Sequence, residues 1–292
     1  MIDLHTHTTF SDGTLDWDKL LEEANKSNIE VLSITDHDNL DSYKMLKNIN
    51  YKEKFKGDII NGIEITSMFN GVKIDLLAYD FEISKLVNWV DTSCKDRKFD
   101  LDKEFEMMKN SCIKNNIIMG DISYDSYDKW PVDIIFNEIK KYDENKKYFK
   151  DKEWNDIDCF FAACTTKVKF PAYVDFSIHY NSAFDVVKEV KQAGGKIFVA
   201  HVFRYLLEDY EDFLNQLLEN KIIDGVEVYH SSFNESQMKF LEKYCEKHNL
   251  LMSGGSDFHG EKKANIKLGI GCGNMNISKN ILNNWKINNK IN

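Results

Sequence analysis

The chain opens with M-I-D-L-H-T-H-T-T-F-S-D-G, Met1 to Gly13, and this stretch governs how the rest is interpreted. Apolar and polar residues alternate from Ile2 to His7 with the period of a β-strand, so His5 and His7 project from the same side. Two such imidazoles can share a divalent ion, and Asp12 in the following S-D-G turn could add a carboxylate oxygen. The pair alone is weak evidence for a metal site, because H-x-H also occurs on ordinary strands.

Length and composition limit the class of protein. With 292 residues, 42% hydrophobic and 29% charged, the chain has a globular composition and the length of one α/β barrel with an insertion. No apolar run reaches the length of a membrane span, and the N-terminus does not have the pattern of a signal peptide. We therefore expect a cytoplasmic protein with no membrane partner.

The formal net charge of -10 argues against a long nucleic acid as partner, because binding one requires clustered Lys and Arg. It does not exclude a small anionic substrate, since bound dications can reverse the local field. The 6 cysteines include no C-x-x-C motif and are expected to be reduced and mostly buried. No feature of the sequence fixes an oligomeric state.

The next predicted strand, V-L-S-I at 31–34, ends in the polar run T-D-H-D. A continuous apolar strand is typical of a parallel sheet covered on both faces, and functional residues follow such strands at their carboxyl ends. His37 is therefore a candidate ligand. Asp38 is expected to cap the following helix, as Thr14 is expected to cap a helix over 15–28.

Two acidic residues interrupt the next two strands. Glu64 lies between two isoleucines in a strand without a polar face, where a carboxylate must be paired, protonated or bound to metal. Asp75 is in a similar position in V-K-I-D-L-L-A-Y. The intervening Asn70-Gly71 turn predicts a hairpin.

The composition changes between 84 and 169, where charged, amide and aromatic residues dominate, helical periodicity appears and histidine is absent. This predicts a helical insertion at 84–169 that divides an α/β body into 1–83 and 170–292. We expect Trp130 and the other aromatic residues there to pack in a core first and to stack on substrate second.

The α/β alternation resumes with a strand predicted at 171–176. Later strands end at metal-type side chains, namely His201, His230, and Asp257 with His259. The carboxyl ends of parallel strands meet at one end of a barrel, so these residues are expected to converge. The Asn-rich tail after Asn274 is expected to fray.

In this order, H-T-H, S-D-G, T-D-H-D, G-I-E, A-H, V-Y-H and G-G-S-D-F-H resemble the PHP superfamily, named for polymerase and histidinol phosphatase. The chain looks most like its stand-alone phosphoesterases, which include nucleoside bisphosphate phosphatases and short-RNA 5′-exonucleases. The motifs cover about 1–80 and 171–273. The resemblance implies a distorted (β/α)7 barrel with a trinuclear metal centre at its strand ends and a helical insertion beside it.

By matching positions, the resemblance also implies ligands for two or three divalent ions, Mn, Zn or Fe. One ion would be held by His5, His7, Glu64 and Asp257, a second by Glu64 and His201, and a third by Asp12, His37 and His259. His230 would complete the cluster or contact the phosphate. Arg204, in A-H-V-F-R-Y, falls where the family often has a phosphate-binding arginine. The expected catalytic residues are Glu64, His201, His230 and Arg204.

The chain departs from the family pattern at two places. Asp75 stands where a strand usually supplies a histidine in H-x-L-G-Y, so it is either a ligand of the second ion or the orienting partner of a neighbouring ligand. The insertion's usual G-R-P-H appears as D-K-W-P-V, which leaves Lys129 as its only cation. The metal-type residues therefore follow the family more closely than the substrate-binding ones.

The function implied is hydrolysis of a phosphoric ester in a small phosphorylated metabolite or a nucleotide, by attack of a metal-bound hydroxide without a covalent intermediate. Two alternatives stay open. One is a metal-binding module with decayed catalysis that serves as a subunit or sensor. The other is a barrel amidohydrolase that uses metal ions in the same way, which Arg204 and the motif order disfavour.

Overall fold

The strands of this computed structural model form two sheets, within the described residues 1–94, 97–125, 128–175, 180–205, 207–289 and 291. The strands are β1 (Ile2–Asp3), β2 (Val31–Leu32), β3 (Asp58–Ile59), β4 (Gly62–Phe69), β5 (Val72–Tyr79), β6 (Asn181–Ser182), β7 (Lys196–Val199), β8 (Gly225–His230) and β9 (Leu251–Gly255). The smaller sheet has the order β1-β2-β3 and the larger one the order β6-β4-β5-β7-β8-β9. Strands β4 and β5 form the predicted antiparallel hairpin, whereas β7, β8 and β9 run parallel.

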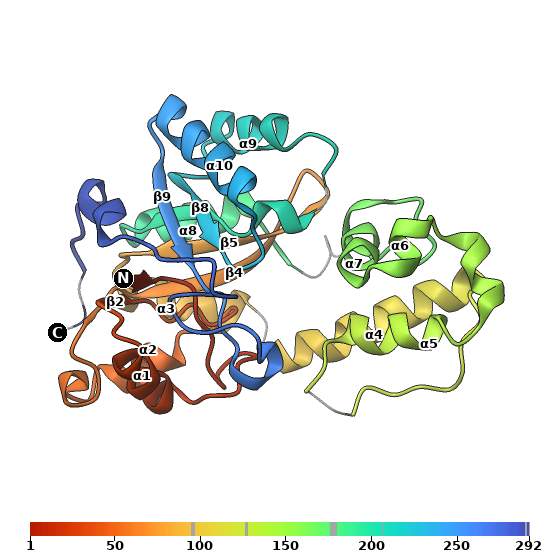
Figure 1. The fold of residues 1–292 in the computed structure, drawn as a ribbon, viewed down its shortest axis with the longest axis horizontal. Helices are drawn as coiled ribbons and strands as arrows, with labels where there is room; N and C mark the ends of the chain where they lie inside the picture. The colour runs from red at the N-terminus through yellow and green to blue at the C-terminus, as the bar shows by residue number, and fades with distance from the viewer. Residues whose placement is uncertain (95–96, 126–127, 176–179, 206, 290, 292) are drawn as a thin grey trace.

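Helices cover both sides of the strands. In the α/β body they are α1 (Trp17–Lys26), α2 (Asp41–Leu46), α3 (Ile83–Ser93), α8 (Ala183–Gln192), α9 (Tyr210–Glu219) and α10 (Glu235–His248). Figure 1 shows α9 and α10 above the strands and α1 and α2 below them. No helix in the described ranges is long and apolar enough to cross a bilayer.

The segment between α3 and β6 is helical and projects to the side of the body (Figure 1). Its helices are α4 (Arg97–Lys114), α5 (Pro131–Ile139), α6 (Asp151–Asn155) and α7 (Ile157–Thr166). They share a hydrophobic cluster that includes Phe105, Phe136 and Phe160 and is separate from the main core of the body. Helical periodicity in the sequence thus predicted the secondary structure of this stretch.

The two sheets meet where the predicted ligands lie. Thr6, beyond β1, forms a parallel bridge with Phe258, beyond β9, and His37, beyond β2, forms one with Glu64 in β4. The amide of Leu4 also donates to the carbonyl of Gly254 at 3.1 Å. These links bring segments from opposite ends of the chain to one place.

Both predicted helix caps are wrong. Helix α1 begins after Asp16, whose carboxylate accepts from the amide of Lys19, while the Thr14 hydroxyl accepts from the amide of Glu261. Helix α2 begins after Leu40, which makes no side-chain cap. The Asp38 carboxylate instead accepts from the amide of Thr66 at 3.3 Å.

The strand predicted at 171–176 is also absent from its described part. Residues 171–175 form a turn and irregular structure, and Phe176 lies outside the described residues. Val174 nevertheless packs in the core of the helical segment, and its amide donates to the carbonyl of Cys164 at 2.9 Å. Its apolar character therefore reflects helix packing, which strand propensity cannot distinguish.

The described part of the Asn-rich tail, 275–289 and 291, packs against the body, contrary to the sequence prediction that the tail frays. Trp285 is fully buried, stacks on Phe198 with ring centroids 4.7 Å apart, and donates from Nε1 to the carbonyl of Met252. The amide of Ile2 donates to the carbonyl of Ile277 at 3.1 Å. The tail is therefore part of the hydrophobic core that contacts β1 and β9.

Candidate metal centre and active site

Glu64 lies at the middle of a cluster of histidines. Its position in β4, between Ile63 and Ile65, leaves the side chain only 1% exposed. Oε2 lies 3.0 Å from His5 Nε2, 3.2 Å from His7 Nε2 and 3.4 Å from His37 Nε2, and Oε1 lies 2.9 Å from His201 Nε2. Burial alone would raise the pKa of Glu64, but the surrounding histidines hold that pKa well below its usual range. The carboxylate is therefore anionic and shared by four imidazoles.

Asp12 and Asp257 extend the cluster on one side. His259 Nε2 lies 3.2 Å from Asp12 Oδ1, and His7 Nε2 lies 3.4 Å from Asp257 Oδ1. Both carboxylates are almost fully buried. Burial, together with the nearby Lys263 and His7, lowers the pKa of His259 to about 4, so this imidazole is neutral and its nitrogen can act as a ligand.

Glu227, which the sequence analysis missed, fixes two of the histidines from behind. Its Oε1 lies 2.7 Å from His5 Nδ1, and its Oε2 accepts from the backbone amide of His201 at 2.7 Å. A carboxylate behind a ligating imidazole orients the ring and makes it a better ligand. The signal was present, since Glu227 stands between two valines as Glu64 stands between two isoleucines.

His230 lies at the end of β8, next to Asp257. Its Nε2 is 3.2 Å from Asp257 Oδ2 and its Nδ1 is 2.7 Å from Ser232 Oγ. Burial lowers the pKa of His230 from its ordinary value. The structure thus brings this predicted residue next to Asp257, another predicted ligand, with its ring 5.5 Å from that of His201.

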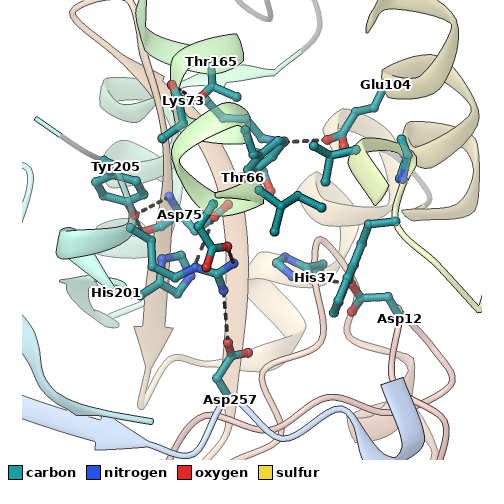
Figure 2. A pocket seen from close by; sticks show the side chains of 18 of the residues that line it. Asp12, His37, Thr66, Lys73, Asp75, Glu104, Thr165, His201, Tyr205 and Asp257 are labelled. Atoms are coloured by element: carbon teal, nitrogen blue, oxygen red, sulfur yellow. Dashed lines mark hydrogen bonds and ion pairs between the residues drawn. The ribbon is translucent and has the colours of Figure 1, made fainter. Parts of the chain in front are cut away.

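Asp75 faces the same region from β5. Its Oδ2 lies 3.8 Å from His201 Nε2, and Figure 2 shows it beside His201 and facing the same cavity as His37. Burial, with the charge of Glu64 nearby, raises the pKa of Asp75. His201 and Lys73 offset part of this effect, and a divalent cation beside Asp75 and Glu64 would relieve the remaining repulsion between the two carboxylates.

Two observations indicate that these residues fit divalent ions. In the described part of the chain, ligand atoms within 4.8 Å of one another occur in three sets: His7, Asp12, His37 and His259; His5, His7 and Glu64; and His37, Glu64 and Asp75. His7 Nε2 and Asp75 Oδ1 are buried and lack a hydrogen bond of good geometry there, although His7 Nε2 lies within ion-pair distance of Glu64 and Asp257. Buried polar atoms are normally satisfied, and metal ions would satisfy those that face the cluster.

Asp36, next to His37 in the T-D-H-D run, has a structural role. Its carboxylate accepts hydrogen bonds from the amide and hydroxyl of Thr8, at 2.7 Å each, and from the hydroxyls of Ser11 and Ser42. These bonds fix the turn that carries Asp12 and leave Asp36 with no oxygen aimed at the cluster.

A cavity of about 250 Å³ opens from the cluster towards the helical segment. Asp12, His37, Asp75, His201 and Asp257 form one end of it (Figure 2). Helices α5 and α7 line another part of it with the apolar residues Pro131, Val132, Ile157, Phe161 and Ala162 and the polar residues Asp133, Asp158 and Thr165. The cavity could hold a charged group at the cluster and a less polar group against the helices.

The cations around this cavity are Arg204, Lys263 and Lys73. Arg204 Nη1 lies 3.7 Å from Asp257 Oδ2, so the structure places the predicted arginine at the cluster. Lys73 is buried and forms an ion pair with Glu104 of α4 at 2.5 Å. Lys129, the other basic residue considered from the sequence, is exposed and does not line the cavity.

Trp130 lies at the cavity and does not pack in the core of the helical segment, which corrects the first of its two predicted roles. Its Nε1 donates to Asp12 Oδ2 at 3.3 Å, and its ring meets that of His259 edge to face, with centroids 5.9 Å apart. The residue precedes Pro131 at the start of α5. The helical segment therefore contacts the cluster directly.

The fold and site define an α/β protein with a buried cluster of histidines and carboxylates of the kind that holds divalent ions. The chain belongs to the PHP domain family, whose model matches residues 3–265. A curated relative is the phosphoribosyl 1,2-cyclic phosphate 1,2-diphosphodiesterase of Eggerthella lenta, 23% identical over 267 residues, covering 89% of this chain and 94% of that protein. The 5′-3′ exoribonuclease of Haemophilus influenzae is 22% identical over 279 residues, covering 88% and 89%.

Solved structures share the fold. A candidate metal-dependent phosphoesterase from Bifidobacterium adolescentis aligns over 96% of this chain and 93% of its own, with a TM-score of 0.62 and 22% identity. An amidohydrolase from Chromobacterium violaceum, with bound sulfate and no metal, aligns over 89% and 88%, with a TM-score of 0.61 and 20% identity. These similarities establish the fold of the chain.

Proposed function

We propose that the protein hydrolyses the phosphoric ester of a small phosphorylated metabolite or a nucleotide, with divalent ions held by the cluster around Glu64. That it is a metal-dependent phosphoesterase follows from its PHP family membership, from relatives that are a cyclic phosphate diphosphodiesterase and an exoribonuclease, and from its buried metal-type residues. The single observation that carries the proposal is the anionic Glu64 shared by four imidazoles.

The proposed ligands are His5, His7, Asp12, His37, Glu64, Asp75, His201, His230, Asp257 and His259. Two or three Mn, Zn or Fe ions bound there would polarise the phosphoryl oxygens and lower the pKa of a bound water. Glu64 would hold neighbouring ions together because both of its oxygens face imidazoles. Arg204 would bind a phosphoryl oxygen, a task that suits its planar guanidinium.

Hydrolysis would proceed by direct attack of water on phosphorus. No serine or cysteine side chain lines the described part of the cavity, which supports a reaction without a covalent intermediate of that kind. The apolar residues that α5 and α7 contribute to the cavity would help to exclude bulk water and so strengthen the electrostatic interactions at the cluster.

We also propose that the body, 1–83 and 170–292, is a distorted (β/α)7 barrel and that 84–169 is an insertion beside it. The parallel bridges from Thr6 to Phe258 and from His37 to Glu64 support a ring of strands. The separate hydrophobic cluster of the helical segment supports an insertion with its own core.

The proposal is tested by assaying metal-stripped protein after reloading with Mn, Zn or Fe(II). Phosphorylated metabolites, mononucleotides, short RNA and long RNA would be compared by phosphate or nucleotide release. We expect hydrolysis of small esters to exceed that of long RNA, and binding to long RNA to be weak even at low salt, because the net charge is -10. Inactivity on every small ester with full metal loading would instead indicate a metal-binding subunit or sensor.

Asp75→His should change the metal preference of the site. A carboxylate is a harder ligand than imidazole and carries a charge, so the wild type should favour Mn relative to Zn more than the histidine variant does. Metal content and activity of both proteins would be measured after separate reloading with Mn and Zn. If preference and stoichiometry were both unchanged, Asp75 would not be a ligand.

A further inference from the structure

The two carboxylate oxygens of Asp257 face different surroundings. Oδ1 lies 3.4 Å from His7 Nε2, within the cluster. Oδ2 accepts from Lys263 Nζ, lies 3.7 Å from Arg204 Nη1 and lies 3.2 Å from His230 Nε2. Asp257 therefore separates the metal-type cluster from a pair of cations, both of which line the cavity.

We propose that Lys263 is a second phosphate-binding residue, which acts with Arg204 on the phosphate oxygens that do not face the cluster. This inference rests on the proposed phosphoesterase function. A phosphate group offers several anionic oxygens, and charge-assisted hydrogen bonds to it are stronger than neutral ones. The two cations approach from separate elements, the turn Val202–Tyr205 after β7 and the turn Gly260–Lys263 after β9, so they can grip one group from two directions.

The helical segment positions both cations. The Trp130 ring lies 5.6 Å from Lys263 Nζ, and Asp158 Oδ1 of α7 lies 3.6 Å from Arg204 Nη2. An aromatic face attracts an ammonium group without neutralising it, unlike a carboxylate. The contact with Trp130 therefore holds Lys263 at the cavity without adding a second countercharge to that of Asp257.

Asp257 is the carboxylate that pairs with Lys263 among the described residues. If Asp257 binds a metal ion, its charge is shared with that ion, and Lys263 has excess positive charge directed at the cavity. An incoming phosphate would restore the balance. The lysine side chain is 17% exposed, which is enough for contact with a ligand in the cavity.

The test uses inorganic phosphate, the expected product, as the probe. Its Kd would be measured by isothermal titration calorimetry on Mn-loaded full-length protein, and bound Mn would be counted by elemental analysis. Lys263→Met removes the charge at similar length, and Lys263→Arg keeps it. Lys262→Met is the matched control, because Lys262 lies 5.5 Å from the same Trp130 ring but does not line the cavity.

We expect Lys263→Met to weaken phosphate binding about 10- to 100-fold with unchanged Mn content, which is the usual effect of losing one charged hydrogen bond. The Kd of Lys263→Arg for phosphate should stay within about threefold of the wild-type value. The Kd of Lys262→Met should equal the wild-type value. Unchanged phosphate affinity in Lys263→Met would overturn the inference, as would a loss of Mn, which would show that Lys263 serves the Asp257 ligand site. After either of these two results, the proposed function would stand as long as the wild-type protein hydrolysed phosphate esters. A wild-type protein that neither bound phosphate nor hydrolysed esters would overturn both the inference about Lys263 and the proposed function.

Discussion

Glu64→Gln should lower phosphatase turnover about a hundredfold or more while the protein stays folded. The amide has nearly the same shape, but it removes the negative charge that His5, His7, His37 and His201 share. It also points an NH2 group at nitrogens that would otherwise bind ions. Turnover would be measured with the best substrate from the screen, and circular dichroism would report the fold.

Glu82→Gln serves as the control for this substitution. Glu82 is an exposed residue at the start of α3, and its carboxylate pairs with Lys85. The same change of charge there should leave turnover unchanged, because surface ion pairs contribute little. Near-normal turnover in Glu64→Gln would show that the reaction does not depend on the Glu64 carboxylate.

Trp285→Ala should destabilise the protein by about 3–5 kcal/mol, the usual cost of truncating a buried aromatic residue. The ring is fully buried between Phe198 and Tyr79, with centroids 4.7 Å and 5.3 Å away, and its Nε1 donates to Met252. The free energy of unfolding would be measured with urea.

The exposed Phe184, also an aromatic residue, provides the comparison for Trp285→Ala. Phe184→Ala should cost less than about 1 kcal/mol, because surface substitutions rarely cost more. If Trp285→Ala were as mild as Phe184→Ala, the tail would not contribute to the core in the way its packing indicates.

The ligand cluster was predictable because the chemistry concentrates at strand ends. His5 and His7 were expected on one face of a strand, and both reach Glu64 even though regular β1 pairing stops at Asp3. The chain stays aligned beyond that point because Thr6 bridges to Phe258. Local sequence pattern and overall fold therefore agree at this place.

Other parts of the site depend on contacts that the sequence pattern does not contain. Glu227 stands between two valines, the pattern that marked Glu64, but its role comes from contacts with His5 and His201, which lie far from it in the sequence. Trp130 and Lys263 meet only because the start of α5 lies against the turn that follows β9. Such contacts between distant segments are set by tertiary structure, which local periodicity does not report.

The tail was misjudged for a compositional reason. Its many asparagines suggested disorder, but a few apolar side chains, Ile277, Leu282 and Trp285, are spaced among them and are buried. Composition averages over a segment, whereas burial depends on which residues face the core. These residues anchor the segment together with Met275, which is buried in the same cluster.

The most direct test of the central claim is the number of divalent ions bound per chain, measured by elemental analysis beside phosphatase activity. Wild-type protein stripped with a chelator and titrated with Mn should bind two or three ions, and activity should rise from near zero as they bind. Glu64→Gln should bind fewer ions at every Mn concentration. Full activity in the stripped protein, or a wild type that binds no ions when saturated with Mn, Zn or Fe, would contradict the account.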